Sequence, residues 1–199
     1  MTFKCSVICN TYNHARFSQA SLRSIFDQNY NNIEIIIVDD GSTDTTVEKI
    51  KDAIRQSPFP HRLISQQNTG NIPLNVNRGI AAASGEYLSF LSLDDLLLPE
   101  SISDKMKLIN ANPKIVFAAN TCNQEINDEG EIIAECFKSP LYGHEISTAA
   151  ELLEIEYAKI GTVYMQGTIV RSDLVRAVGG MDEDISGDDL ILRTKLFKH

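Results

Sequence analysis

The sequence predicts an α/β fold in which a Rossmann-like, mainly parallel central sheet is flanked by helices. Three observations support this prediction. Short β-branched runs alternate with stretches of helical spacing through the first half of the chain, as in successive strand–helix–strand units. The run at 33–38 is apolar almost throughout, which is typical of a strand covered on both faces. Right-handed crossovers between such strands produce a doubly wound sheet.

Short apolar runs bounded by turn residues predict strands, and apolar side chains that recur every three to four residues predict helices. The predicted strands are residues 4–10, 33–38, 62–66, 87–93, 114–122, 131–137 and 162–170. The predicted helices are residues 17–26, 44–56, 74–83, 99–110, 149–157, 172–178 and 190–197. A turn at 127–130 should let the strand at 131–137 pair back as a hairpin.

Several helix boundaries are marked by residues with a specific backbone preference. Thr43 or Asp44 is expected to cap the second helix, because both side chains can accept a hydrogen bond from a free backbone N–H. Ser84-Gly85 should stop the third helix, and Pro99 should open the fourth. These signals set the order strand, helix, strand over the first half of the chain.

Composition narrows the class of protein. A chain of 199 residues suggests one domain with a sizeable core. A formal net charge of −9 argues against nucleic acid or an anionic membrane surface as the main partner. No apolar stretch reaches the roughly 18 residues of a membrane span. The chain enters its first strand at once, so no secretory signal and a cytoplasmic location are expected.

The four cysteines form no Cys-x-x-Cys pair: Cys5, Cys9, Cys122 and Cys136. We interpret them as reduced thiols rather than zinc ligands or disulfides.

Polar residues follow three of the predicted strands. Asn10–Asn13, Asp39–Asp44 and Asp94-Asp95 each lie just past a strand's carboxyl end. In a parallel sheet these ends share one edge, and ligands bind there. Segments that are far apart in the sequence are therefore expected to line one crevice.

Asp94-Asp95 ends a buried strand and is followed by more apolar residues. Adjacent carboxylates repel, so a cation is expected to offset the cost, and Mg²⁺ and Mn²⁺ favour carboxylate and phosphate oxygens. The alternative is a solvated acidic turn. The apolar flanks weaken that alternative, because they tie the pair to the core.

The segment Asp39–Asp44 combines acids, a glycine and a helix start. A carboxylate here can accept a hydrogen bond from a nucleobase imide or a ribose hydroxyl. A plain strand-to-helix turn is the competing interpretation. The segment contains neither G-x-G-x-x-G nor G-x-x-x-x-G-K-[ST], so a dinucleotide fingerprint and a P-loop are not supported.

A second acid pair, Asp188-Asp189, precedes the last predicted helix. One of these acids could act as a general base toward an attacking hydroxyl, and the alternative is simple capping of the helix. The four histidines show no paired spacing, and we interpret them as surface or loop residues: His14, His61, His144 and His199.

Together these stretches resemble family 2 of the glycosyltransferases, which are inverting nucleotide-sugar enzymes with a GT-A fold. The stretches that carry the resemblance are Ser6–Asn13, Glu34–Asp44, Asn68–Gly70, Asn77–Ile80 and Gly85–Asp95, in the family's order and spacing. Val178–Glu183 and Asp188-Asp189 with Arg193 resemble its later E-D region more loosely.

The chain departs from the family pattern at several points. Asn10 replaces the usual proline, and Ser92 stands where many members have the first Asp of their metal motif. Asp188-Asp189 replaces Glu-Asp, one residue closer to Arg193 than expected. Relatives usually continue beyond the position of His199, so we expect a C-terminally truncated domain with a nucleotide-binding half at 1–99 and an acceptor-side half at 100–199.

The resemblance implies transfer of a sugar from a nucleotide-sugar donor, UDP-linked by expectation, to a saccharide or glycolipid hydroxyl, as in polysaccharide or glycoconjugate biosynthesis. It assigns Asp40 with Asp39 to the base and ribose, flanked by Asn10 and Thr11. The metal, Mn²⁺ or Mg²⁺, is assigned to Asp95 with help from Asp94, which could instead contact the ribose. Asp188 or Asp189 would be the base. Missing segments could associate with the inner face of a membrane.

Two other functions remain as alternatives. A non-catalytic nucleotide-sugar binding module is compatible with Ser92 and with the early end of the chain. A sugar nucleotidyltransferase ranks lower, because it would need a glycine-rich loop bearing Lys or Arg after the first strand, and Cys9–Asn13 supplies none.

Overall fold

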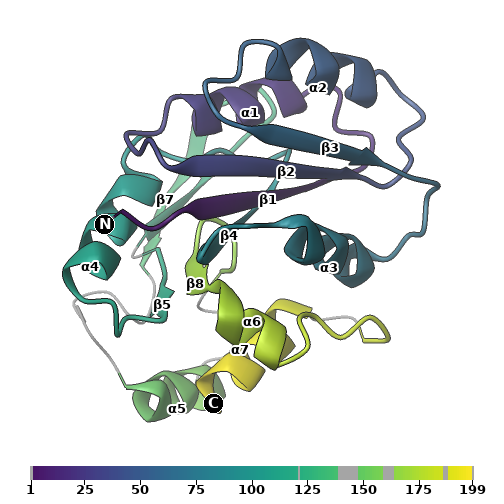
Figure 1. The fold of residues 1–199 in the computed structure, drawn as a ribbon. Helices are drawn as coiled ribbons and strands as arrows, with labels where there is room; N and C mark the ends of the chain where they lie inside the picture. The colour runs from purple at the N-terminus through teal and green to yellow at the C-terminus, as the bar shows by residue number, and fades with distance from the viewer. Residues whose placement is uncertain (1, 121, 139–147, 159–163, 186–187, 199) are drawn as a thin grey trace.

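A computed structural model describes residues 2–120, 122–138, 148–158, 164–185 and 188–198 of the chain. Its centre is a six-stranded sheet of order β3-β2-β1-β4-β8-β5 (Figure 1). The strands are β1 (Cys5–Thr11), β2 (Ile33–Asp39), β3 (His61–Ser65), β4 (Tyr87–Ser92), β5 (Phe117–Ala118) and β8 (Ile169–Arg171). The first four are mutually parallel, and β8 runs antiparallel to both β4 and β5. The predicted α/β architecture with a mainly parallel sheet is confirmed.

Helices cover both faces of this sheet (Figure 1). One face packs against α1 (Ser18–Phe26), α2 (Thr46–Ile54) and α4 (Ser101–Ala111). The other packs against α3 (Ile72–Ala82), α6 (Ser172–Ala177) and α7 (Asp188–Phe197), with α5 (Ala149–Ala158) at its margin. Alternate residues of β2 point to opposite faces, so Ile35 and Ile37 join the first core and Ile36 and Val38 the second. This explains why residues 35–38 of the strand are all apolar.

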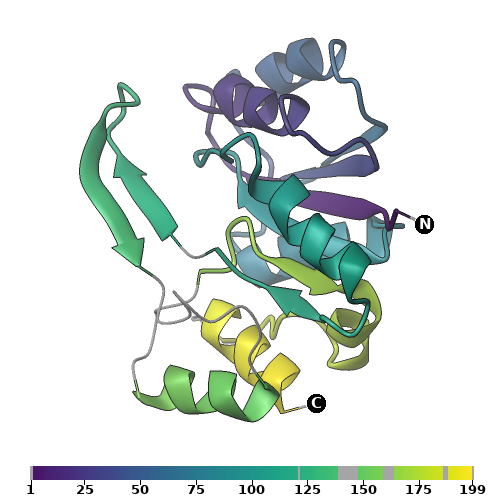
Figure 2. The same ribbon diagram turned by 90° about the vertical axis from the view of Figure 1, so that its left-hand side faces the viewer.

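The second half departs from the predicted strands. The apolar run at 114–122 forms only the two-residue β5, and a separate hairpin follows, made of β6 (Cys122–Ile126) and β7 (Ile132–Lys138). The predicted turn at 127–130 closes it, with Gly130 at φ 85°. The hairpin extends away from the sheet (Figure 2). The strand predicted at 162–170 is shorter, because β8 begins only at Ile169; residues 159–163 lie outside the described part of the chain.

The helices match their predicted positions more closely. The capping prediction for α2 is wrong in position, since Thr45 occupies the N-cap without a side-chain cap bond. Asp44 still serves this end, because its Oδ1 accepts from the Thr46 N–H at 2.9 Å and its Oδ2 accepts from the Ala15 N–H at 3.2 Å. Within the described residues, no helix combines the length and apolar character needed to cross a bilayer.

The interpretation of the cysteines holds for two of them. Cys5 and Cys9 are free and fully buried, and burial raises the pKa of the Cys5 thiol to about 12. Cys122 is disulfide-bonded, so its prediction as a reduced thiol is wrong. The side chain of Cys136 lies outside the described part.

A buried carboxylate joins three strands at the edge opposite the acid pairs. Glu34 on β2 accepts from Ser6 Oγ at 2.5 Å and from the backbone N–H groups of Ser84 at 2.5 Å and Gly85 at 3.0 Å. Lys4 Nζ lies 3.0 Å from its Oε2. Burial alone would raise the pKa of Glu34, but the hydrogen bonds from Ser6 and Ser84 and the Lys4 ammonium outweigh it and lower the pKa to about 2.

The low pKa of Glu34 predicts a pH-dependent stability. Because the folded-state pKa lies below the unfolded value, the stabilisation is complete above about pH 4.5 and is lost as pH falls toward 2. Glu34→Gln should lower the free energy of unfolding at pH 7 by up to about 3 kcal/mol and much less near pH 2. Urea unfolding at both pH values measures this. Glu154→Gln, at an exposed position on α5, is the control. An equal loss at both pH values would contradict the prediction.

Candidate active site

The loops after β1 and β2 are joined by Asn13, which adopts a left-handed φ of 55°. Asn13 Oδ1 accepts from the backbone N–H groups of Thr43 at 2.8 Å and Asp44 at 3.3 Å. The Asn13 N–H donates to Ser42 Oγ at 2.9 Å. Asparagine tolerates this backbone conformation better than most residues. The two loops therefore form one continuous ledge at the carboxyl ends of the strands.

Asp39 and Asp40 have different surroundings although they are adjacent. Asp39 is 1% exposed, and its carboxylate accepts from Ser42 Oγ at 2.5 Å and from Ser65 Oγ at 2.9 Å. These bonds tie its own loop to β3. Asp39 is thus engaged in holding the ledge together.

Asp40 holds the loop that leads into α3. Its Oδ1 accepts from Gln66 Nε2, the Thr69 N–H and Thr69 Oγ1, each at 2.9 Å, and its Oδ2 accepts from the Gly70 N–H at 3.0 Å. Burial alone would raise the pKa of Asp40, but the hydrogen bonds from Gln66 and Thr69 prevail and lower it. The carboxylate stays ionised, and Oδ2 retains a lone pair for one further donor.

The end of β1 lies between these acids and the acid pair in the turn after β4. The carbonyl of Thr11 accepts from the Asp40 N–H at 3.0 Å, and the carbonyl of Asn10 accepts from the Leu93 N–H at 3.1 Å. Thr11 is 3% exposed, and its Oγ1 has no hydrogen-bond partner among the described residues. Asn10, Thr11, Asp40 and the residues just before Asp94 therefore share one edge, as predicted from the parallel strand order.

Asp94 and Asp95 lie in an exposed turn that is anchored on both sides. Leu93 and Leu97 are buried in the core, and Ser21 Oγ on α1 donates to the Asp95 carbonyl at 2.7 Å. Although Asp95 is exposed, partial desolvation of its carboxyl, then repulsion from Asp94, raises its pKa, and a nearby histidine offsets part of this rise. The charged form of the Asp95 carboxyl is therefore disfavoured, and a bound cation would favour it.

That histidine is His14, which lies in the loop after β1, in line with its interpretation as a surface or loop residue. Its Nε2 lies 3.6 Å from Asp94 Oδ2, and its Nδ1 is buried without a hydrogen-bond partner in the described structure. The sequence offered one indication of the contact between His14 and Asp94. His14 follows a strand that ends on the same sheet edge as Asp94.

The second acid pair begins α7. Asp189 Oδ2 accepts from the Met165 N–H at 3.4 Å, while the side chain of Asp188 lies outside the described part. Next to Met165, Gln166 Oε1 accepts from the Ser92 N–H at 2.8 Å at the end of β4. Asp189 is therefore connected to the Asp94-Asp95 turn through two adjacent residues. The sequence pattern did not single out Gln166.

The segment before α7 is fixed on α3 by one amide. Asn77 Nδ2 donates to the Met181 carbonyl at 2.9 Å, and Asn77 Oδ1 accepts from the Met181 N–H at 2.9 Å. Gly180 has φ 69°, and a Cβ there would lie 2.4 Å from Asn77 Oδ1, so only glycine fits. This contact joins two stretches that the resemblance singled out, Asn77–Ile80 and Val178–Glu183.

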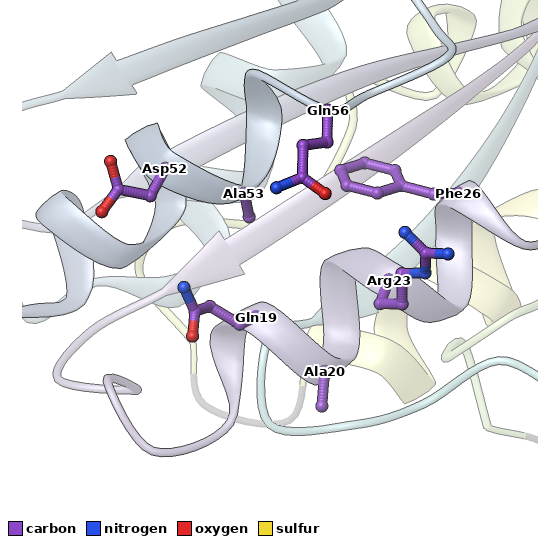
Figure 3. Close-up of a pocket in the computed structure, with 7 residues that line it drawn as sticks. All are labelled: Gln19, Ala20, Arg23, Phe26, Asp52, Ala53 and Gln56. Carbon is purple, nitrogen blue, oxygen red and sulfur yellow. The ribbon is translucent and has the colours of Figure 1, made fainter.

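A groove of about 360 Å³ lies elsewhere, between α1 and α2 (Figure 3). It contains none of the predicted site residues. Its lining is Gln19, Ala20, Arg23, Phe26, Asp52, Ala53 and Gln56.

Solved structures share this fold. The structure of S. aureus TarS 1-349 in complex with UDP-GlcNAc matches 98% of this chain and 53% of that chain, with a TM-score of 0.77 and 20% identity. The mannosyltransferase PcManGT from Pyrobaculum calidifontis, in complex with GDP-Man and Mn²⁺, matches 98% of this chain and 52% of that chain, with a TM-score of 0.71 and 18% identity. The fold is thus that of the GT-A glycosyltransferases.

An uncharacterized glycosyltransferase of Nostoc sp. is 33% identical over 141 residues, which cover 63% of this chain and 44% of that protein. The chain thus spans less than half the length of this relative and about half the length of the two matching structures. Residues 6–159 match the model of glycosyl transferase family 2, and the chain belongs to this family.

Proposed function

We propose that this chain carries the donor site and the base of an inverting glycosyltransferase, which moves a sugar from a UDP-linked donor to the hydroxyl of a saccharide or glycolipid. The observation that carries the proposal is the connection of Asp40, Asp94-Asp95 and Asp189 along one sheet edge. Family membership supports the reaction class. Residues 1–99 would form the donor half and residues 100–199 the acceptor side.

The nucleoside would bind at the ledge formed by the loops after β1 and β2. Asp40 is ionised and has acceptor capacity left on Oδ2, so it suits a nucleobase imide or ribose hydroxyl. Thr11 has a buried hydroxyl with no hydrogen-bond partner in the part of the chain that the structure describes, and Asn10 lies beside it. Asp39 would contribute indirectly, by keeping the ledge in place through Ser42 and Ser65.

The diphosphate would bind at the Asp94-Asp95 turn together with Mn²⁺ or Mg²⁺. The donor set fits such an ion, because two exposed carboxylates suit a hard cation that completes its shell with water and phosphate. Among the described residues, no three His, Cys, Asp or Glu side chains are grouped to hold a metal by themselves. A bound ion would neutralise charge on the departing nucleotide. Asp95 is the principal ligand in this proposal, and Asp94 contacts the metal or the ribose.

The transfer would be a direct displacement. The acceptor oxygen forms a bond to the anomeric carbon as the bond from that carbon to the nucleotide oxygen breaks, with inversion. Asp189 is the proposed base and takes the hydroxyl proton, and Asp188 is the alternative. The contact between Asp189 and the Met165 N–H supports this choice, because it links Asp189 to the end of β4.

A thermal-shift screen of nucleotides tests the donor site. UDP should raise the melting temperature only when Mn²⁺ or Mg²⁺ is present, because Asp95 and Asp94 would hold the ion and the ion would offset the negative charge of the diphosphate. A nucleotide at 100 times its dissociation constant would stabilise the chain by about 2.7 kcal/mol. GDP and ADP are the controls that test whether binding depends on the nucleobase. Indifference to every nucleotide with metal would refute the proposed function, and binding without any transfer would favour the non-catalytic module.

A further inference from the structure

A compact turn at Tyr164–Thr168, here called the bridging turn, is docked on the end of β4. Thr168 Oγ1 donates to the Tyr164 carbonyl at 2.7 Å, and the Thr168 N–H donates to the Met165 carbonyl at 3.0 Å. The Gly167 N–H donates to the Phe90 carbonyl at 2.8 Å. Met165 is 1% exposed. The bridging turn is therefore closed by its own hydrogen bonds and attached to β4, the strand that leads to Asp94-Asp95.

Gln166 supplies a hydrogen bond that the sheet lacks at this point. The Leu93 N–H points toward β1, so the preceding N–H of Ser92 points to the opposite side, toward β8. Strand β8 pairs with β4 only as far as Ser89 and provides no acceptor there. Gln166 Oε1 accepts from the Ser92 N–H at 2.8 Å instead. Ser92 lies two residues before Asp94, so this bond anchors the acid-bearing turn.

Two further contacts fix the bridging turn relative to the rest of the site. The Gln166 carbonyl accepts from Asn120 Nδ2 at 2.7 Å, at the base of the β6–β7 hairpin. The Met165 N–H donates to Asp189 Oδ2 at 3.4 Å. The anchor on Ser92 and the contact with Asp189 thus come from neighbouring residues. Any shift of the bridging turn would change the placement of Asp189 relative to Asp94-Asp95.

We propose that Gln166 is a positioning residue for sugar transfer, which sets the placement of Asp94-Asp95 relative to Asp189 through its bond to the Ser92 N–H. The inference rests on the proposed function, in which these acids hold the leaving diphosphate and activate the attacking hydroxyl. Displacement needs attacking oxygen, anomeric carbon and leaving oxygen in line, and a misplacement of about 1 Å can cost on the order of 100-fold in rate.

Two substitutions distinguish the effect of losing the hydrogen bond to the Ser92 N–H from the effect of changing the size of the Gln166 side chain. Gln166→Met keeps the length and removes the acceptor, whereas Gln166→Glu keeps an acceptor for the Ser92 N–H. In Gln166→Met, hydrogen exchange at the Ser92 amide should accelerate at least about tenfold and kcat for transfer should fall about 10- to 100-fold. The dissociation constant for UDP with Mn²⁺ should rise by a smaller factor than kcat falls, because Asp40, Asp94 and Asp95 all remain, whereas transfer also depends on their placement relative to Asp189. Gln166→Glu should keep Ser92 protected and a kcat at least about tenfold above that of Gln166→Met.

Gln124→Met, at an exposed position on β6, is the matched control and should change none of these quantities. Unchanged Ser92 exchange in Gln166→Met would overturn the inference, and so would an unchanged kcat. Equal loss of kcat in both Gln166 variants, with Ser92 still protected in Gln166→Glu, would overturn it as well. A further outcome separates the two proposals. If the unmodified chain transfers no sugar, and Gln166→Met still accelerates exchange at the Ser92 amide, the proposed function is refuted. The hydrogen bond from the Ser92 N–H to Gln166 is then still supported as an anchor of the turn.

Discussion

Asp95→Ala should abolish the stabilisation of the chain by UDP with Mn²⁺ and reduce transfer at least about 1000-fold, because Asp95 would be the main residue that holds the ion, and the ion would neutralise charge on the diphosphate. The ligand-free protein should melt at an equal or slightly higher temperature. This second expectation follows from the raised pKa of Asp95, since partial desolvation of this exposed residue's carboxyl and repulsion from Asp94 disfavour the charged form in the folded protein. The variant would therefore lose function without losing stability.

The measurement is a thermal-shift titration of UDP at several Mn²⁺ concentrations, followed by a transfer assay. Asp104→Asn removes an exposed acid from α4 and should leave both quantities unchanged. Asp94→Ala is expected to weaken metal-dependent binding less than Asp95→Ala. Full UDP and Mn²⁺ binding by Asp95→Ala would refute the assignment of the metal to this turn. A large drop in the melting temperature of the ligand-free variant would show instead that Asp95 is structural.

The sheet and its ligand-binding edge could be predicted from the sequence because local patterns determine them. Ile33–Val38 and Tyr87–Leu93 are apolar and short, and helical stretches separate them. Parallel order then follows from crossover geometry, and it brings Asp40 and Asp94 to the same edge. The second half was less predictable. An apolar run such as 114–122 is compatible with one long strand, yet it divides into the short β5 and the start of a hairpin.

Contacts between distant residues account for what the sequence did not reveal at the site. Asp39 and Asp40 are the same residue type in adjacent positions, but Ser65 engages the first and Thr69 the second. Both partners lie more than 25 residues away, since the separations are 26 and 29. Gln166 could not be identified from the sequence for the same reason, because its hydrogen-bond partner, the Ser92 N–H, lies 74 residues earlier. A pattern of residue types cannot indicate such pairings without the fold.

Asp189→Asn should lower kcat for transfer about 100- to 10,000-fold while the affinity for the UDP-linked donor with Mn²⁺ stays within about threefold. Asparagine keeps the shape of the side chain and can still accept from the Met165 N–H, but it cannot take a proton from the acceptor hydroxyl. Transfer rates and donor titrations on the same preparations separate the two effects.

Asp188→Asn is the matched comparison and should retain most of the activity. The reverse result, with Asp188→Asn inactive and Asp189→Asn active, would move the base to Asp188; full activity in both would refute a base in this pair. Loss of donor binding in Asp189→Asn would indicate a structural role for Asp189, which links α7 to the bridging turn.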